Sequence, residues 1–183
     1  MLVLASKSPR RRELLGLYTK EFVIDVSDAF EPEFEGGSVR DYVMSLAAIK
    51  AREVASRHPG DTVIGADTVV AFGGAVLGKP KSEAHAKEML MSMSGGVQEV
   101  YTGVCVIKDG AELLDAVCTK VIFRELSEQE IDAYVATGEC MDKAGAYGIQ
   151  GGAGEFVCEI SGDYFNVIGL PMKRLVEMLE NNF

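Results

Sequence analysis

The sequence contains no long hydrophobic run and few cysteines or histidines. Its first apolar stretch, residues 1–5, is too short for the core of a signal peptide, and no later run approaches the roughly 18 apolar residues of a membrane span. The four cysteines form no CxxC pair and have no histidine at metal-ligand spacing, which argues against a zinc site or a disulfide framework. We therefore expect a cytoplasmic protein that does not bind a membrane, with reduced and mostly buried thiols.

Basic residues are also scarce relative to acidic ones. The 18 lysines and arginines and 28 aspartates and glutamates give a formal net charge of -10 and a pI near 4.7. Such a surface repels a polyanion at long range, so a long nucleic acid is not expected as a partner. The 183 residues suffice for one domain or for two tightly joined lobes.

Apolar runs alternate with helical patterns along the whole chain, which predicts an α/β layered fold without a linker. The Asp109-Gly110 pair is typical of a hairpin turn, so the sheet should contain antiparallel neighbours. The predicted strands are residues 2–5, 22–26, 62–72, 97–107, 113–123 and 156–160. The predicted helices are residues 9–17, 39–56, 83–93, 128–137 and 171–180. Capping residues Ser127 and Glu130 mark the start of the fourth helix, and a proline marks the start of the last.

Three consecutive arginines, Arg10 to Arg12, stand out in this acidic chain. Ser8 is a good N-cap and Pro9 suits a first helical turn, so the free N–H groups of a helix should form an anion site here. Cations in this turn oppose the helix dipole, which suggests that they serve a negative ligand.

The helical spacing separates these arginines. Arg10 and Arg11 lie four residues before the leucines of the buried stripe, whereas Arg12 falls on the solvent side. We therefore interpret Arg10 and Arg11 as ligand-binding residues. A basic turn that pairs with Glu13 or another nearby acid is the alternative, and the local pattern favours neither.

Two further charged residues interrupt apolar patterns. Lys50 lies on the apolar face of the helix at 39–56, where a lone lysine either meets an anion or, more commonly, extends to solvent. Asp67 interrupts an apolar strand, and a carboxylate there needs a metal, a lysine or several donors. We interpret Asp67 as a site residue in preference to a strand-end turn or a structural ion pair. The acidic stretch that contains Glu31 is interpreted mostly as a solvated loop.

Two glycine-containing segments also need interpretation. Residues 73–79 fit G-x-x-x-x-G-K, but Pro80 replaces the Ser or Thr that would bind Mg²⁺, so this is not a Walker A motif. Lys79 stays a candidate phosphate ligand, with an ordinary surface lysine as the alternative. The segment DKAGAYGIQGGAG has five glycines among thirteen residues. Such a segment lets a ligand approach the backbone closely, or it serves only as a flexible connection.

Five motifs taken in order resemble those of the Maf family of nucleoside triphosphate pyrophosphatases: LASKSPRRREL, VIGADTVV, LGKP, DKAGAYGIQG and GDYFNVIGLPM. They span nearly the whole chain and are very specific as a set. The resemblance implies a single Maf-like domain over residues 1–183 with an elongated, Maf/ITPase-like α/β fold. In this fold a mixed, twisted central sheet is flanked by helices, and two lobes surround a deep cleft. The implied reaction converts a nucleoside triphosphate to the monophosphate and pyrophosphate with a divalent cation, and the family also suggests a homodimer.

The resemblance also implies roles for individual residues. The residues that match the cleft of the family are Ser8, Arg11, Glu31, Lys50, Asp67 and Lys79. Asp67 matches the proposed proton acceptor. The positions at which the branches of the family differ in substrate are Arg10, Thr68 and Gln150, and they resemble the dTTP and UTP branch rather than the 7-methyl-GTP branch. One departure is Gln98, where many members carry a histidine, and His58 and His85 lie on predicted surface elements that do not replace it.

The expected chemistry agrees with these residue types. A triphosphate carries about four negative charges in the scissile region, which Arg10, Arg11, Lys50, Lys79 and a helix N-terminus can stabilise. Asp67 is the candidate for activating water, and Glu31 and Asp67 are the candidates for binding Mg²⁺, Mn²⁺ or Co²⁺. Carboxylate oxygens suit such hard cations.

Three hypotheses follow from the sequence. The first is a pyrophosphatase that hydrolyses dTTP and UTP and so cleans the nucleotide pool. The second is the same chemistry on a purine or modified nucleotide such as 7-methyl-GTP. The third is a nucleotide-binding regulator of septum formation that does not catalyse a reaction.

Overall fold

The computed structural model describes residues 1–181, which cluster into two compact units. Unit 1 comprises Met1–Thr68, Tyr101–Val117 and the C-terminal segment from Phe165, and unit 2 comprises Val69–Val100 and Cys118–Tyr164. No helix within these described residues is long and apolar enough to cross a membrane.

The sheet has seven strands in the order β2-β1-β3-β5-β6-β7, and β4 pairs with β3 outside this path. The long strands β3 (Thr62–Phe72), β5 (Val97–Lys108) and β6 (Ala111–Phe123) contribute residues to both units. Parallel pairs join β1 to β2 and to β3, whereas β4 is antiparallel to β3 and β7 is antiparallel to β6. The mixed sheet with flanking helices confirms the predicted α/β class.

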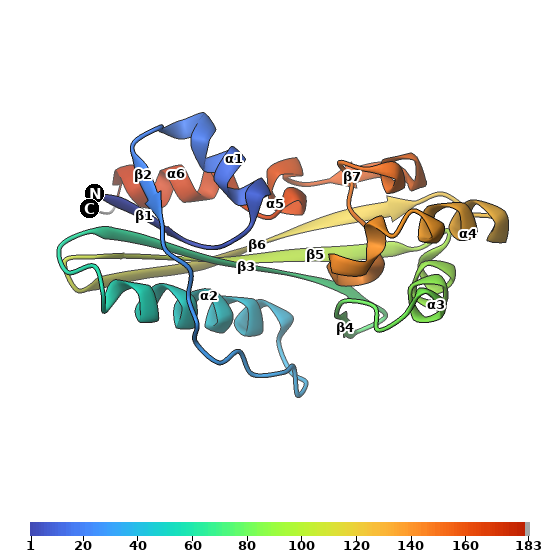
Figure 1. Ribbon diagram of the computed structural model, residues 1–183, viewed down its shortest axis with the longest axis horizontal. Coiled ribbons are helices and arrows are strands. Elements are labelled where there is room, and N and C mark those ends of the chain that lie inside the picture. Colours follow the sequence, from blue (N-terminus) through green and yellow to red (C-terminus); the bar gives the residue numbers. More distant parts are fainter. Residues whose placement is uncertain (182–183) are drawn as a thin grey trace. The chain divides into compact units, whose positions relative to one another are not determined.

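Unit 1 places helices on both faces of its part of the sheet. The strands β1 (Leu2–Ala5) and β2 (Phe22–Ile24) lie beside β3, and the long helix α2 (Val39–Ala55) covers one face, as Figure 1 shows. The other face is covered by α1 (Pro9–Tyr18) and α6 (Met172–Asn181), the latter preceded by the short helix α5 (Tyr164–Ile168).

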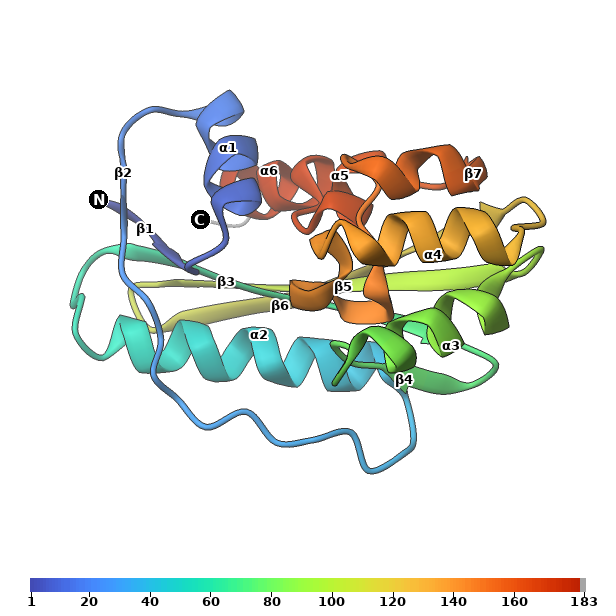
Figure 2. The same cartoon turned by 45° about the vertical axis from the view of Figure 1, so that its right-hand side comes forward.

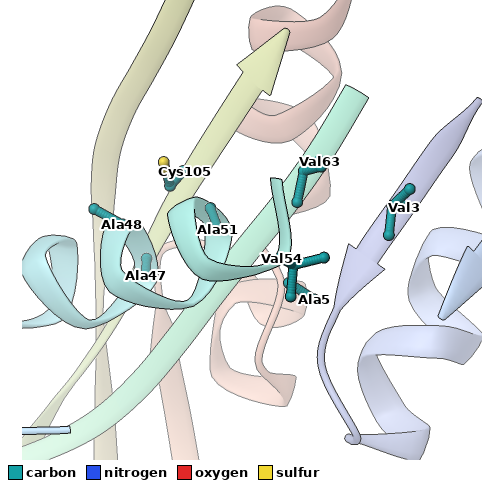
Figure 3. Close-up of a cluster of buried hydrophobic side chains, with 8 residues drawn as sticks. All are labelled: Val3, Ala5, Ala47, Ala48, Ala51, Val54, Val63 and Cys105. Carbon is teal, nitrogen blue, oxygen red and sulfur yellow. The ribbon is translucent and has the colours of Figure 1, made fainter. Parts of the chain in front are cut away.

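The helix α2 packs very closely on the sheet. Small side chains make this possible, and Figure 3 shows the buried cluster of Val3, Ala5, Ala47, Ala48, Ala51, Val54, Val63 and Cys105. Two strand glycines lie directly under the helix. A Cβ atom added at Gly65 would lie 2.4 Å from the carbonyl oxygen of Ala47, and one at Gly103 would lie 2.3 Å from that of Val43. These contacts fix α2, and therefore Lys50, against β3 and β5.

We expect Gly103→Ala to lower the free energy of unfolding by about 1–3 kcal/mol, because a methyl group would press on the backbone of α2. Urea denaturation measures the change. Gly16→Ala in α1 is the matched control, since its Cβ would only approach Lys20 Nζ at 3.6 Å and alanine favours helix. If Gly103→Ala were as stable as this control, the close contact between α2 and β5 would be wrong.

Unit 2 contains β4 (Ala75–Leu77), α3 (Glu83–Met93), α4 (Glu128–Ala136) and β7 (Val157–Ser161). The helices α3 and α4 lie side by side (Figure 2), and Lys87 Nζ lies 2.7 Å from carboxylate oxygens of both Glu128 and Asp132. Three 3₁₀ helices follow α4, at Glu139–Asp142, Ala144–Ala146 and Gly152–Phe156. They form most of the glycine-rich segment.

Every predicted helix and strand is present, with small shifts at the ends. The capping box of Ser127 and Glu130 is confirmed, and Asp109 (φ 50°) and Gly110 (φ 81°) form the hairpin turn. The strand β2 ends at Ile24, which pairs with Leu4 of β1, and not at residue 26. Sequence patterns missed β4 and α5, which are only three and five residues long.

The prediction for the thiols was only half right. None of the four cysteines, which all lie within residues 1–181, forms a disulfide; Cys105 and Cys140 are buried, but Cys118 and Cys158 are exposed. Cys118 lies on β6 and Cys158 on the edge strand β7, and a strand with one open face exposes alternate side chains.

Candidate active site

The arginine-rich turn forms the start of α1 as predicted. Ser8 is the N-cap, and its Oγ accepts a hydrogen bond from the backbone N–H of Arg11 at 3.4 Å. Pro9 occupies the first turn, which contains no acidic residue. The backbone N–H of Arg12 donates to the Ser8 carbonyl oxygen at 3.2 Å, so the N–H of Arg10 is the one in this turn that has no acceptor within residues 1–181. This N–H group and the cationic side chains form an arrangement suited to an anion.

Arg11 is held by three hydrogen bonds to groups of unit 1. Its Nε donates to the carbonyl oxygen of Gly169 at 2.8 Å, one terminal nitrogen donates to Ser6 Oγ at 3.3 Å, and the other donates to Thr68 Oγ1 at 3.0 Å. A guanidinium has five N–H donors, so one N–H on each terminal nitrogen stays available. Two such donors match the oxygens of a phosphate group.

The three arginines differ in exposure as the spacing predicted. Arg12 is exposed, whereas Arg10 and Arg11 are partly buried. Within the described residues, none of the three forms an ion pair, so the alternative of a basic turn paired with Glu13 is wrong.

Burial and nearby charges have opposing effects on the pKa of Arg11. Burial lowers the pKa of its guanidinium below the ordinary value, and the carboxylate of Asp67 opposes this effect. Arg10 lowers the same pKa further, and Glu31 raises it. These four groups are therefore close enough to form one electrostatic cluster, and arginine keeps its charge in it.

Lys50 bridges the two candidate carboxylates. Its Nζ lies 2.6 Å from Asp67 Oδ1 and 2.9 Å from Glu31 Oε2. The Lys50 and Asp67 side chains are only 16% and 13% exposed, against 46% for Glu31. Lys50 thus meets anions instead of extending to solvent. Asp67 does form an ion pair, but it lies inside β3 and not in a strand-end turn, and its Oδ2 accepts no hydrogen bond from residues 1–181.

The acidic loop before α2 is anchored near Glu31. The hydroxyl group of Tyr42 donates to the carbonyl oxygen of Pro32 at 3.0 Å, and the rings of Tyr42 and Phe34 are 5.1 Å apart. Burial raises the pKa of Tyr42, and the carboxylates of Asp67 and Glu31 raise it further. The prediction of a mostly solvated loop is confirmed, since Glu31, Glu33 and Glu35 are exposed, and Tyr42 anchors this loop where Glu31 meets Lys50.

The structure brings most of the candidate residues together in unit 1: Ser8, Arg10, Arg11, Glu31, Lys50, Asp67 and Thr68. The remaining two, Lys79 and Gln150, belong to unit 2. Both are exposed, and no residue in the described part of the chain forms an ion pair with Lys79 or a hydrogen bond with Gln150.

The glycine-rich segment of unit 2 is held by hydrogen bonds from its backbone N–H groups. Gly145 donates its N–H to the carbonyl oxygen of Gly78 at 3.1 Å, which ties the segment to the loop that carries Lys79. Gly152 donates its N–H to Glu139 Oε2 at 3.2 Å, and a Cβ at Gly151 would lie 1.6 Å from Glu139 Oε1. The segment beside Gln150 is thus a folded loop and not merely a flexible connection.

Sequence reasoning missed the groups that hold Arg11. Gly169 lies 158 residues away along the chain, and its φ of +128° is one that favours glycine. Ser6 and Thr102 are buried polar residues. A threonine in the apolar strand β5 was the available signal for Thr102, and the glycine of the motif GDYFNVIGLPM was the signal for Gly169.

Gln98, which replaces a histidine common in the Maf family, is a core residue of unit 2. It is fully buried, and its Nε2 donates to the carbonyl oxygen of Met93 at 3.1 Å. His58 Nε2 lies 2.8 Å from Asp25 Oδ2, and His85 Nδ1 accepts from the backbone N–H of Lys81 at 3.1 Å. Both histidines thus serve local contacts, as expected for residues that do not replace the missing one.

The two carboxylates fit a hard divalent cation as a minimal protein ligand set. Residues 1–181 contain no group of three or more His, Cys, Asp or Glu side chains arranged for a metal ion. Asp67 and Glu31 do converge on the single ammonium group of Lys50. Two carboxylates with phosphate oxygens and water as further ligands are typical of Mg²⁺ sites that act on nucleotides.

These features define an α/β protein in which a cationic helix N-terminus, suited to an anion, lies near a pair of carboxylates. The chain belongs to the Maf family. The model of this family, described as Maf-like protein, matches residues 1–182. A protein of Thermococcus onnurineus (strain NA1) named dTTP/UTP pyrophosphatase is 53% identical over 183 residues, which cover 100% of this chain and 98% of the relative. A protein of Bacillus cereus (strain AH187) with the same name is 50% identical over 179 residues, which cover 98% of this chain and 94% of the relative. A solved structure, the Staphylococcus aureus Ham1 protein, has a TM-score of 0.46 at 15% identity and covers 67% of this chain and 71% of its own.

Proposed function

We propose that this protein hydrolyses dTTP and UTP to the nucleoside monophosphate and pyrophosphate. The observation that carries the proposal is the position of Arg11, which keeps two N–H donors available within the electrostatic cluster that contains Asp67. The names of the relatives at about 50% identity support the same reaction and the same two substrates.

The cationic side of the site binds the triphosphate. The N-terminus of α1 and the side chains of Arg10 and Arg11 supply positive charge, and neither arginine forms a direct ion pair within the described residues. Lys79 of unit 2 is the further phosphate ligand in this proposal. Fixed cations and N–H groups stabilise charge that develops on the phosphates during cleavage, which is the largest requirement of this chemistry.

The anionic side activates water. Asp67 Oδ1 is bound to Lys50, and its Oδ2 is available for a water molecule. Phosphate oxygens of a bound substrate compete for the Lys50 ammonium, which releases Asp67 Oδ1 from its hydrogen bond when the substrate is in place. Asp67 then accepts the proton of the water that attacks the α-phosphorus. Glu31 and Asp67 would hold the divalent cation, Mg²⁺, Mn²⁺ or Co²⁺, which supplies charge neutralisation when bound.

A nucleotide panel tests the proposed reaction. Pyrophosphate release is measured with dTTP, UTP, CTP, GTP and 7-methyl-GTP, each with and without a chelator. We expect dTTP and UTP to be the best substrates and chelation to abolish turnover. A preference for a purine or modified nucleotide would favour the second hypothesis. Binding without turnover in the presence of each of the three metals would favour a non-catalytic regulator.

A homodimer and a cytoplasmic location form part of this proposal. The homodimer rests on the family resemblance, and the location agrees with a nucleoside triphosphate substrate. Sedimentation of the purified protein tests the dimer, and a monomer at micromolar concentration would contradict it.

Gln150 is the proposed base-recognition residue. Its amide offers a donor and an acceptor to the edge of uracil or thymine, whereas a glutamate would only accept and would face a base carbonyl. We expect Gln150→Glu to reduce kcat/KM for UTP and dTTP by about tenfold or more, since an unmatched polar group costs about 1–3 kcal/mol. GTP should lose proportionally less, because guanine presents two donors to a carboxylate.

The control for this substitution is Gln129→Glu, which makes the same charge change on the exposed face of α4. We expect this variant to keep the activity and the substrate ranking of the unmodified protein. An unchanged ranking of UTP, dTTP, CTP and GTP in Gln150→Glu would remove Gln150 from base recognition.

A further inference from the structure

A chain of hydroxyl groups runs from Arg11 into the interior of unit 1. The Arg11 guanidinium donates to Thr68 Oγ1 at 3.0 Å, and Thr68 Oγ1 lies 2.9 Å from Thr102 Oγ1. Thr102 Oγ1 in turn donates to the carbonyl oxygen of Asn166 at 3.0 Å. Thr102 is fully buried, so this chain is shielded from water over its inner half.

The direction of the hydrogen bonds follows from the number of protons. Each threonine hydroxyl has one proton to donate, and Thr68 Oγ1 accepts from Arg11. If Thr102 donates to Asn166, Thr68 donates to Thr102, and both bonds are short, at 2.9 and 3.0 Å. In the opposite order Thr68 would donate to Gly169 at 3.5 Å and the Asn166 carbonyl would lose this donor. In the first order every link is a good hydrogen bond, and hydrogen bonds joined in such a chain strengthen one another.

We propose that Thr68 and Thr102 are positioning residues that fix the guanidinium of Arg11 for phosphate binding. The proposal rests on the proposed pyrophosphatase function and assigns a task within it. The chain holds one terminal nitrogen, while the Gly169 carbonyl and Ser6 hold the Nε and the other. With all three nitrogens fixed, the two remaining N–H groups keep constant directions, which lowers the entropy cost of binding a phosphate.

This assignment gives Thr68 a second task. The family resemblance placed Thr68 among the positions that differ with the substrate, which suggests contact with the base. In unit 1 its hydroxyl group accepts from Arg11 and donates to Thr102, which leaves one lone pair of its oxygen for a further donor. Thr102 is fully buried and acts only through the phosphate-binding arginine, so it affects all nucleoside triphosphates to the same extent, because they share the phosphate chain.

The test compares kcat/KM for UTP, dTTP, CTP and GTP among the unmodified protein, Thr68→Val, Thr102→Val and Thr102→Ser. We expect Thr102→Val to lose about tenfold for every nucleotide, the effect of weakening one hydrogen bond to a charged group, with an unchanged ranking, and Thr68→Val to lose at least as much. Thr102→Ser keeps the hydroxyl group and should stay within about twofold of the unmodified protein. A changed ranking in Thr102→Val, or full activity of Thr68→Val, would overturn the assignment.

A double-mutant cycle separates positioning from a general loss of structure. Arg11→Lys keeps the charge but has no planar fork to be aligned, so adding Thr102→Val to it should cause no further loss of kcat/KM. An equal loss in both backgrounds would show that Thr102 acts only on the fold.

Thr119→Val is the matched control, because Thr119 is also buried and its hydroxyl group forms hydrogen bonds with the backbone of Asp163 in unit 2. We expect it to lower the melting temperature without the tenfold loss of kcat/KM.

Failure of the pyrophosphatase proposal can be distinguished from failure of the positioning role. If the unmodified protein hydrolysed none of the nucleotides, the pyrophosphatase proposal would fail. Calorimetric titration with inorganic pyrophosphate would still test the positioning role. Weaker binding to Thr102→Val than to the unmodified protein and to Thr102→Ser would support it, and equal binding to all three would contradict it.

Discussion

Asp67→Asn is expected to lower pyrophosphate release by at least about a hundredfold while nucleotide binding is kept, because an amide cannot accept the proton of the attacking water. The asparagine side chain has the size of aspartate, and its oxygen can still accept the hydrogen bond that Lys50 now donates at 2.6 Å. The phosphate-binding groups of α1 are not changed. Single-turnover measurements and calorimetric binding of a non-hydrolysable triphosphate separate the two effects.

Two further variants show whether the loss belongs to Asp67. Glu35→Gln removes one charge from an exposed residue of the acidic loop, for which the structure shows no hydrogen bond within residues 1–181, and it should leave turnover unchanged. Glu31→Gln removes the other carboxylate bound to Lys50. If Asp67→Asn retained near-normal turnover at saturating metal and Glu31→Gln did not, Glu31 would be the base.

The elements of the fold could be predicted because their signals are local. Ser8, Ser38, Ser82 and Ser127 each cap the helix that follows, through a bond between a side chain and a backbone N–H three residues later. Turn chemistry at Asp109 and Gly110 fixed the hairpin. Local patterns carry less information for very short elements, and the strand β4 and the helix α5 were missed for this reason.

The charged part of the site could be predicted because charges are anomalous where they lie. Arg11 opposes a helix dipole, and Asp67 interrupts a buried strand, so each needs a partner outside its own element. The identity of those partners could not be predicted. Lys50 and Asp67 are 17 residues apart, and the bond between them forms only when α2 lies on β3. The contact of Glu31 with Lys50 depends in addition on Tyr42, whose packing no sequence pattern indicated.

Apart from Ser8 and Thr68, the neutral groups that orient the site were missed. Thr102 and the carbonyl group of Gly169 belong to segments that fold against α1 from distant parts of the chain. A hydroxyl or carbonyl group carries no charge to attract notice, and a buried threonine in a strand has a common structural explanation. Charged residues can therefore be proposed from sequence, whereas the groups that set their direction require the fold.

The adjacent arginines of α1 give the sharpest contrast between phosphate binding and surface charge. We expect Arg11→Ala to lower kcat/KM for dTTP and UTP by about a hundredfold or more, because two charge-assisted hydrogen bonds to phosphate are lost. Arg12→Ala removes the same charge from the next residue, which is exposed, and should stay within about twofold of the unmodified protein.

Alanine at position 11 also removes the hydrogen bonds that Arg11 donates to the Gly169 carbonyl, Ser6 and Thr68, so the melting temperature must be measured in parallel. Arg11→Lys keeps the charge with a smaller loss of packing and should still lose most of the activity, since an ammonium group lacks the planar fork. Equal activities of Arg11→Ala and Arg12→Ala would show that the turn acts only through its net charge and would remove Arg11 from the site.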